Sequence, residues 1–176
     1  MHDTEDKQWW CEHTANKDEI EFVEQIAPRL DLDIIINPQK ENNKTAPDLL
    51  WNGQLAELKS PRTPFFMAKK YFNIPADWAV TFNTKDYHRY IALYPEIPIL
   101  FHVRWEQLKK KIHGKIYTVN PIEGVWETSI QQINQFVKDG AKIHTYWKRI
   151  NDKRGNAKAS LGLDLRKMKC HMRKGG

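Results

Sequence analysis

The spacing of hydrophobic residues predicts one helix near the start of the chain, followed by strands and further helices. Apolar residues recur every three or four positions over 20–30, which is typical of an amphipathic helix. The β-branched run at 34–36 predicts a buried strand. Asn52-Gly53 lies between two short apolar runs and predicts a β-hairpin, because this dipeptide suits the positive φ angles of a type I′ turn.

Beyond the hairpin, helical and strand patterns alternate. Helices are predicted over 64–72, 84–94 and 128–138, a helical turn over 106–111, and strands over 78–82, 97–105, 115–119, 142–148 and 159–165. This alternation predicts an α/β fold with a central mixed β-sheet flanked by helices. Hydrophobic types make up 40% of the 176 residues, which is enough for one compact domain over 1–176.

Composition predicts a cytoplasmic protein. The longest apolar stretches, such as 97–101, are far shorter than the roughly 20 residues that a membrane-spanning helix needs. The first six residues are polar or acidic after the methionine, unlike a signal peptide, which is basic and then apolar. Only two cysteines are present, Cys11 and Cys170, and this number fits a reducing compartment better than a disulfide scaffold.

Positive charge is concentrated in the second part of the chain. The net charge is +6, but residues 1–105 carry 12 Lys and Arg against 16 Asp and Glu, whereas residues 106–176 carry 16 against 6. Such a basic region favours a polyanionic partner, nucleic acid before anionic lipid, because binding to phosphates releases counterions. The alternative is a basic surface that only aids solubility.

The predicted hairpin places two acids opposite each other. With Asn52-Gly53 as the turn, Asp48 pairs with Glu57 across the strands, and their Cβ atoms are expected about 4.5–5.5 Å apart. Lys59 shares that face, because side chains alternate along a strand. Two like charges destabilise a sheet unless they are compensated, so either Lys59 neutralises them or a divalent cation such as Mg²⁺ binds between them.

Glu19 is the acid of the predicted helix that points the same way as its apolar residues. At about 100° per residue, Val23 and Ile26 lie near Glu19 on the helical wheel, whereas Glu21 lies near the opposite side. Glu19 can therefore point toward the sheet and join the hairpin acids. The alternative is a capping role, in which the Glu19 side chain reaches back to the backbone of Asn16.

Together these residues resemble the PD-(D/E)XK nuclease superfamily. A helix with an acid and a strand precede two short motifs separated by eight residues, Pro47-Asp48 and Glu57-Leu58-Lys59. The resemblance covers about residues 16–105 in the order of the elements. It implies a restriction endonuclease-like core over this region, with residues 106–176 as a basic extension.

The resemblance also implies a site and a reaction. Asp48, Glu57 and the backbone carbonyl of Leu58 would hold Mg²⁺, for which Mn²⁺ could substitute, and Glu19 would hold the metal indirectly or contact a second ion. Lys59 would orient or help deprotonate the attacking water and stabilise charge on the phosphate. The implied activity is that of an endonuclease, which hydrolyses phosphodiester bonds in DNA with a metal-activated water.

Basic residues near the implied site and beyond it are candidates for contact with nucleic-acid phosphates. They are Arg62, Lys69, Lys70, Lys109, Lys110 and Lys111. The alternative function is a non-catalytic nucleic-acid-binding module with the same fold, and a protein-binding or inhibitor protein is a third. A homodimer is compatible with the sequence, although no pattern in it requires one.

Overall fold

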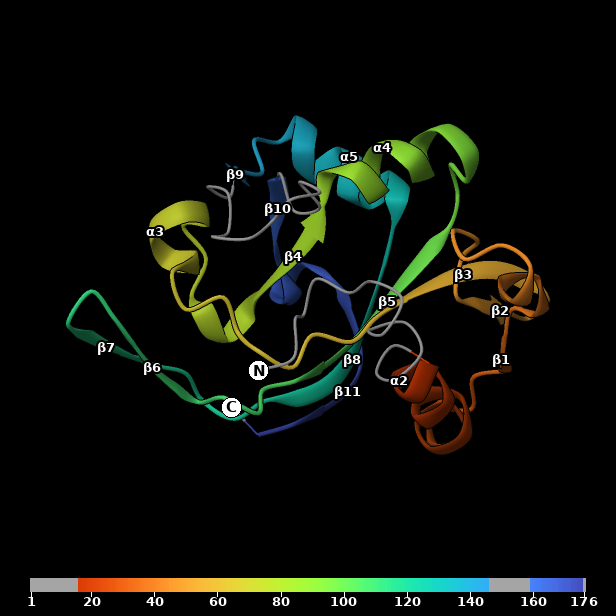
Figure 1. Cartoon of the computed structure of the whole chain (residues 1–176), viewed down its shortest axis with the longest axis horizontal. Coiled ribbons are helices and arrows are strands. Elements are labelled where there is room, and N and C mark those ends of the chain that lie inside the picture. Colours follow the sequence, from red (N-terminus) through yellow and green to blue (C-terminus); the bar gives the residue numbers. More distant parts are fainter. Residues whose placement is uncertain (1–15, 146–158, 176) are drawn as a thin grey trace. The chain divides into compact units, whose positions relative to one another are not determined.

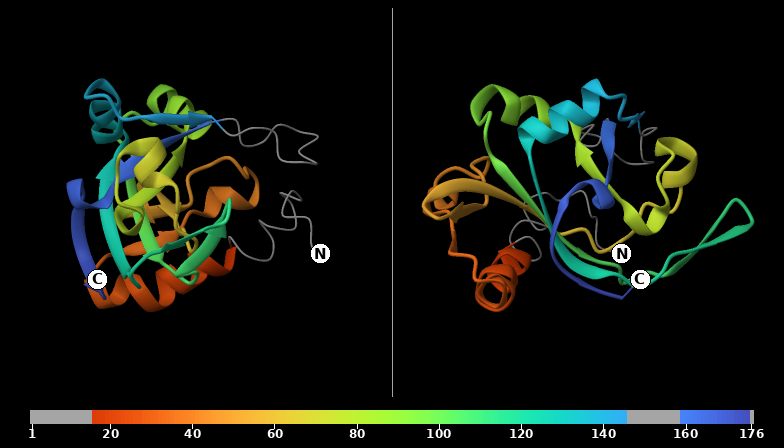
Figure 2. Two further views of the ribbon diagram at one scale, coloured as in Figure 1. Left: turned by 90° about the vertical axis from the view of Figure 1, so that its left-hand side faces the viewer. Right: turned by 180° about the vertical axis from the view of Figure 1, so that it is seen from behind.

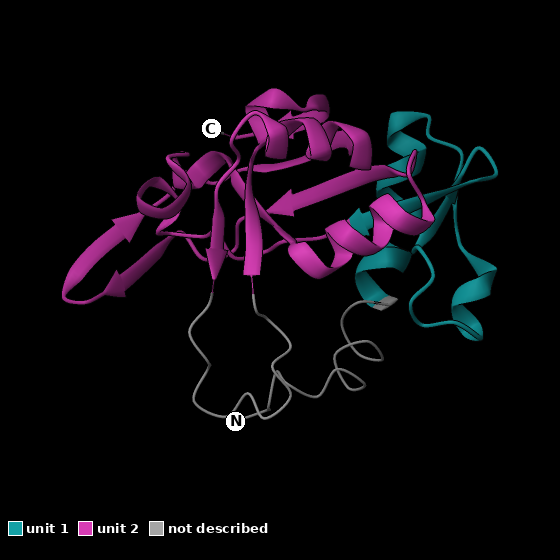
Figure 3. Ribbon diagram, turned by 90° about the horizontal axis from the view of Figure 1, so that it is seen from above, with its two compact units in different colours: residues 1–58 teal, residues 59–176 magenta. Residues whose placement is uncertain are grey.

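The chain is built from two compact units, residues 1–58 and residues 59–176 (Figure 3). The computed structural model describes residues 16–145 and 159–175. Strands and a few helices occur in this part of the chain, which confirms the α/β class (Figure 1). None of the helices described is both long enough and apolar enough to cross a membrane. The expectation of a single domain stays a prediction.

In its described part, from residue 16 on, unit 1 contains a helical segment and three short strands. The helical segment comprises α2 (Asn16–Glu21), a π-helical turn (Phe22–Ile26) and a 3-10 turn (Ala27–Leu30), and it is followed by β1 (Ile34–Ile36), a 3-10 turn (Pro38–Glu41), β2 (Leu49–Trp51) and β3 (Gln54–Lys59). Strand β2 pairs antiparallel with β1 on one side and with β3 on the other. The helical segment ends at Asp31, whose φ of 52° is left-handed.

The first helix is present where the sequence predicts it, but its buried face differs in part. Asp18, Glu19 and Phe22 are buried together with Ile26, whereas Ile20 is 43% exposed. Residues two apart on a helix point to nearly opposite sides, so the face that buries Phe22 leaves Ile20 toward solvent. The prediction that Glu19 faces inward is confirmed by its burial.

The Asn52-Gly53 hairpin forms as predicted. Both turn residues have positive φ angles, 49° and 75°, as a type I′ turn requires. The pairs across the strands are Trp51 with Gln54, Leu50 with Leu55, and Leu49 with Ala56. Strand β2 begins at Leu49, so Asp48 precedes the paired region instead of forming a fourth pair.

Strand β1 is less buried than its sequence predicts. Ile34 is 5% exposed, but Ile35 and Ile36 are 51% and 36% exposed. Among the described residues, the β1 strand lies at one end of the sheet and pairs with β2 alone, so its other edge is unpaired there. An apolar run of three residues therefore marks a strand here without marking a buried one.

Unit 2 contains the remaining helices and strands. They are α3 (Ala68–Phe72), β4 (Ala79–Asn83), α4 (Thr84–Leu93), β5 (Pro98–Arg104), β6 (Lys109–Ile112), β7 (Lys115–Thr118), β8 (Glu123–Ser129), α5 (Ile130–Lys138), β9 (Ile143–Thr145), β10 (Ala159–Asp164) and β11 (Lys169–Lys174). The antiparallel pairings are β5 with β8, β8 with β11, β4 with β10, β10 with β9, and β6 with β7. Helices α4 and α5 lie side by side (Figures 1 and 2).

Two predictions for unit 2 are wrong in detail, and one strand was not predicted. The helical turn expected over 106–111 does not form, and strand β6 begins at Lys109 instead. His113 and Gly114, which follow the end of β6, form a hairpin turn with φ angles of 47° and 79°. The helix expected from 128 begins at Ile130, since β8 continues to Ser129 and the Ser129 hydroxyl caps the helix. The basic tail includes an unpredicted strand, β11.

Candidate functional site

One ammonium group joins two of the predicted site acids in unit 1. The Lys40 Nζ atom lies 2.5 Å from Glu19 Oε1 and 2.5 Å from Asp48 Oδ1. The side chains of Lys40, Glu19 and Asp48 are only 19%, 7% and 17% exposed. The helix acid and the hairpin acid therefore meet at a single positive charge that is largely shielded from water.

Sequence reasoning did not identify Lys40, which belongs to the 3-10 turn between β1 and β2. Asn37 caps this turn, since its Oδ1 accepts from the backbone N–H of Gln39 and its Nδ2 donates to the Pro47 carbonyl at 2.8 Å. Asn37 is 1% exposed. The dipeptide Asn37-Pro38 is a capping residue followed by a proline suited to the first helical position, and this signal could have located the turn.

The second hairpin acid, Glu57, lies on β3 and is 3% exposed. Its Oε2 accepts from the backbone N–H of Asp48 at 3.4 Å, while Asp48 Oδ2 accepts from the backbone N–H of Leu58 at 3.3 Å. Asp48 thus turns one carboxylate oxygen toward Lys40 and the other toward β3. The structure brings Glu19, Asp48 and Glu57 into one chain of contacts.

The acids around Lys40 favour its charged form. Burial would lower the pKa of Lys40, but the negative charges and hydrogen bonds of Asp48 and Glu19 outweigh this effect, and the pKa is raised above its ordinary value of 10.5. The group is therefore an ammonium at neutral pH. Its charge compensates two carboxylates that would otherwise repel each other.

Lys59 is the last residue of β3 and the first residue of unit 2. Its Nζ lies 3.3 Å from Asp86 Oδ2 and 5.7 Å from the centre of the Phe82 ring. Asp86 also binds Arg89, at 3.0 Å. Lys59 therefore contacts Asp86 of α4 and Phe82 of β4. Lys40 compensates Asp48 as well, and the expectation that Lys59 shares in this compensation stays a prediction.

The predicted phosphate-binding residues lie in three places in unit 2. Arg62 forms an ion pair with Glu106 at 2.7 Å. On α3, Lys69 donates to Asn73 at 2.9 Å and Lys70 lies 5.4 Å from the centre of the Tyr71 ring. The other three, Lys109, Lys110 and Lys111, form most of strand β6 and are all exposed.

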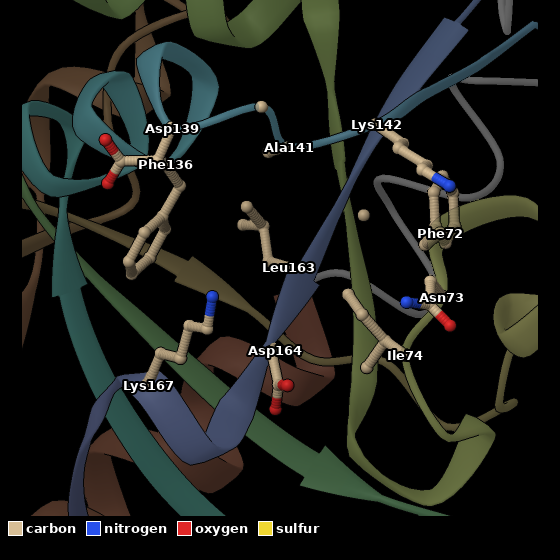
Figure 4. A pocket seen from close by; sticks show the side chains of 12 residues that line it. Phe72, Asn73, Ile74, Phe136, Asp139, Ala141, Lys142, Leu163, Asp164 and Lys167 are labelled. Carbon is tan, nitrogen blue, oxygen red and sulfur yellow. The ribbon is translucent and has the colours of Figure 1, made fainter.

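Unit 2 also has a pocket of its own, lined by both acidic and basic side chains (Figure 4). Phe72, Ile74 and Leu163 contribute apolar side chains to its lining, and Lys142 and Lys167 contribute basic ones. Asp164, which also lines it, is held by two contacts from the Arg166 guanidinium at 2.9 and 2.7 Å. The pocket does not present a free pair of acids.

The acids of unit 1 have the chemistry of a cation site, although the position is taken by an amine. Across residues 16–145 and 159–175, no three His, Cys, Asp or Glu side chains are grouped so that they could hold a metal ion. The Glu19 and Asp48 carboxylates nevertheless converge on one positive charge, and carboxylate oxygens are the donors that Mg²⁺ prefers. A divalent cation at this position stays a prediction.

Comparison with known proteins gives no family. No family model, no curated protein and no solved structure matches this chain. The chemistry of Glu19, Lys40, Asp48 and Glu57 is therefore the basis for assigning a function.

Proposed function

We propose that this protein is a divalent-metal-dependent nuclease with a restriction endonuclease-like core, which hydrolyses phosphodiester bonds in DNA. The observation that carries the proposal is the meeting of Glu19 and Asp48 at one cation, with Glu57 held against Asp48 on the next strand. Folding alone gains little from burying several carboxylates, because each must be desolvated. A catalytic need for a concentrated negative charge accounts for the arrangement.

The proposed metal site uses Asp48, Glu57 and the backbone carbonyl of Leu58, with Glu19 in support. All four donors are oxygen, which suits Mg²⁺ and Mn²⁺. When bound, such an ion lowers the pKa of water and offsets the charge of the phosphate. Lys40 occupies the place of this positive charge while no divalent ion is bound.

Lys59 has a separate role in the proposal. It follows Leu58 directly, and its ammonium is held by Asp86, which limits the conformations of its long side chain. A positioned ammonium stabilises negative charge that builds up on a phosphate during hydrolysis. Asp86 is thus a positioning residue for Lys59.

Cleavage of DNA by the purified full-length protein tests the proposal. With Mg²⁺ or Mn²⁺ the protein should nick or cut plasmid DNA, and Asp48→Ala or Lys59→Ala should lower the rate by about 100-fold or more. Glu24→Gln is the matched control, because Glu24 is an exposed acid of the same helical segment as Glu19. Cleavage that survives both site substitutions, or that falls equally in the control, would reject the nuclease.

A second function is favoured by one specific observation, the Lys40 ammonium itself. Because Lys40 already compensates Glu19 and Asp48, the protein could keep this cluster as structure and only bind nucleic acid. Calorimetric titration with Mn²⁺ separates the two functions. A nuclease should release or absorb heat that disappears in Asp48→Ala, whereas a binding module should give the same trace with both proteins.

A further inference from the structure

The β6–β7 ribbon, residues 109–118, contributes no buried residue to the core of unit 2. Its two strands extend away from the rest of unit 2 (Figures 1 and 2). Every residue in it is exposed or half-buried, and Ile116 is 54% exposed. A two-stranded hairpin is only marginally stable by itself, and this one does not bury a face in return.

Local features give the ribbon a defined shape. His113 and Gly114 form a two-residue turn with φ angles of 47° and 79°, the type I′ geometry that matches the twist of paired strands. Four residue pairs continue from it, ending with Lys109 opposite Thr118. On β7, Lys115 Nζ lies 5.4 Å from the centre of the Tyr117 ring. The arm is therefore a preformed ribbon and not an extended loop.

The ribbon carries lysines on both of its faces. Because side chains alternate along a strand, Lys109 and Lys111 lie on one face, and Lys110 lies on the other. Lys115 stands opposite Ile112 and so shares the face of Lys110. In the described part of the chain, none of these four lysines forms an ion pair with a carboxylate, and the sequence has no Asp or Glu between residues 106 and 123.

We infer that the ribbon binds in the major groove of duplex DNA, with each face turned toward the phosphates of one strand. This inference rests on the proposed function, because it identifies duplex DNA as the substrate of the proposed nuclease. The major groove of B-form DNA, about 12 Å wide, admits a two-stranded β-ribbon, whose strands are about 4.8 Å apart. A groove has phosphates on both sides, which matches two basic faces.

Other anionic partners match the ribbon less well. A flat anionic surface would meet one face and leave two lysines unused. A single strand is usually bound by aromatic rings that stack on its bases, but the Tyr117 ring has the Lys115 ammonium over it. The major groove of duplex RNA is too narrow for side chains to enter. Duplex DNA remains the partner that uses all four lysines.

The test measures DNA binding by the full-length protein without divalent metal, so cleavage is not needed. Two double variants remove equal charge from opposite faces, Lys109→Gln with Lys111→Gln, and Lys110→Gln with Lys115→Gln. A third, Lys85→Gln with Lys138→Gln, removes the same charge from exposed helix positions in unit 2. Circular dichroism and a thermal melt confirm that each variant is folded.

Fluorescence anisotropy on a 20-base-pair duplex should show loss of affinity for both face variants and not for the helix variant. Each lost pair of phosphate contacts should reduce the salt slope by about 1.8, so the fall in affinity between 50 and 200 mM salt should be about tenfold smaller than for the wild type. The wild type should prefer the duplex to single-stranded DNA, to duplex RNA and to anionic vesicles.

Several results would overturn the inference. They are an effect of one face only, an equal effect of the helix variant, equal affinity for single-stranded DNA, tighter binding to RNA or vesicles, or no DNA binding. The two proposals can also fail separately. Salt-dependent duplex binding through both faces without any cleavage would support the role of the ribbon and reject the nuclease. Normal cleavage by both face variants would support the nuclease and reject the role of the ribbon.

Discussion

Replacing Lys40 with methionine tests whether the acids of unit 1 form a cation site. Methionine keeps most of the side-chain length and removes only the charge and its hydrogen bonds. In the variant, Glu19 and Asp48 lose a shared partner at 2.5 Å while Glu19 stays 6% exposed. Breaking a buried ion pair by removing one partner costs about 3–5 kcal/mol, and the partial exposure of Asp48 places this case near the lower value.

We therefore expect Lys40→Met to lower the free energy of unfolding by about 3 kcal/mol in buffer with EDTA. For a protein of this size, that corresponds to a fall in the melting temperature of about 6–12 °C. Lys44→Met is the matched control, because Lys44 is an exposed lysine of the same loop. Its effect should stay within about 0.5 kcal/mol.

Adding Mn²⁺ makes the experiment decisive. A cation that binds the folded state at 100 times its dissociation constant stabilises that state by about 2.7 kcal/mol, so Mn²⁺ should restore most of the stability lost in Lys40→Met. The double variant Lys40→Met with Asp48→Asn should gain much less. Equal melting temperatures for Lys40→Met and Lys44→Met, or no response of Lys40→Met to Mn²⁺, would refute the reasoning.

Two further predictions concern unit 2. Gly162→Ala should destabilise the protein by about 1–3 kcal/mol in urea unfolding, because the new Cβ would overlap the Phe72 ring, and adding Phe72→Leu should recover part of the loss. Burial would raise the pKa of Asp164, but its bonds to Arg166 outweigh this effect and lower the pKa below the ordinary value of 3.8. The ionised Asp164 therefore contributes fully to the free energy of unfolding above pH 3.8, and this contribution is lost as the pH falls through the lowered pKa. Asp164→Asn should thus cost about 1 kcal/mol at pH 6 and progressively less below pH 3.8, and equal costs at both pH values would contradict the assignment.

Local signals in the sequence predict unit 1 well. Asn52-Gly53 determines both the turn and the register of β2 and β3, because few residues other than Asn and Gly tolerate two successive positive φ angles. The periodicity of the helix predicts that Glu19 faces inward. These features depend on a few neighbouring residues, so a short stretch of sequence contains the information.

Lys40 could not be placed in the same way. Its two contacts join residues 21 and 8 positions away in the chain, and they depend on the path of the loop that Asn37 ties to Pro47. Nothing in the polar sequence around Lys40 distinguishes it from Lys44. A contact set by the tertiary path of a loop has no periodicity, and the sequence therefore offered Lys59 or a divalent cation as partners of Asp48 without indicating Lys40.

The strands missed in unit 2 share a different cause. Strand β6 contains three lysines, strand β11 contains two lysines and an arginine, and both have little of the apolar alternation that marks a half-buried strand. Strand β11 is instead fixed by its partner, since Lys169 and His171 both contact Glu127 of β8, at 3.0 and 2.7 Å. Charged strands form here by pairing, which single-strand patterns do not reveal.

The two type I′ hairpins show why turn chemistry indicates shape but not role. Asn52-Gly53 and His113-Gly114 have nearly the same φ angles and each joins two antiparallel strands. The first is followed by a strand whose Ala56, Glu57 and Leu58 are buried, so its acids are held among apolar neighbours. The second joins strands without a buried residue. The side chains on the paired strands therefore decide which hairpin concentrates negative charge and which presents positive charge, and the proposed nuclease would use both.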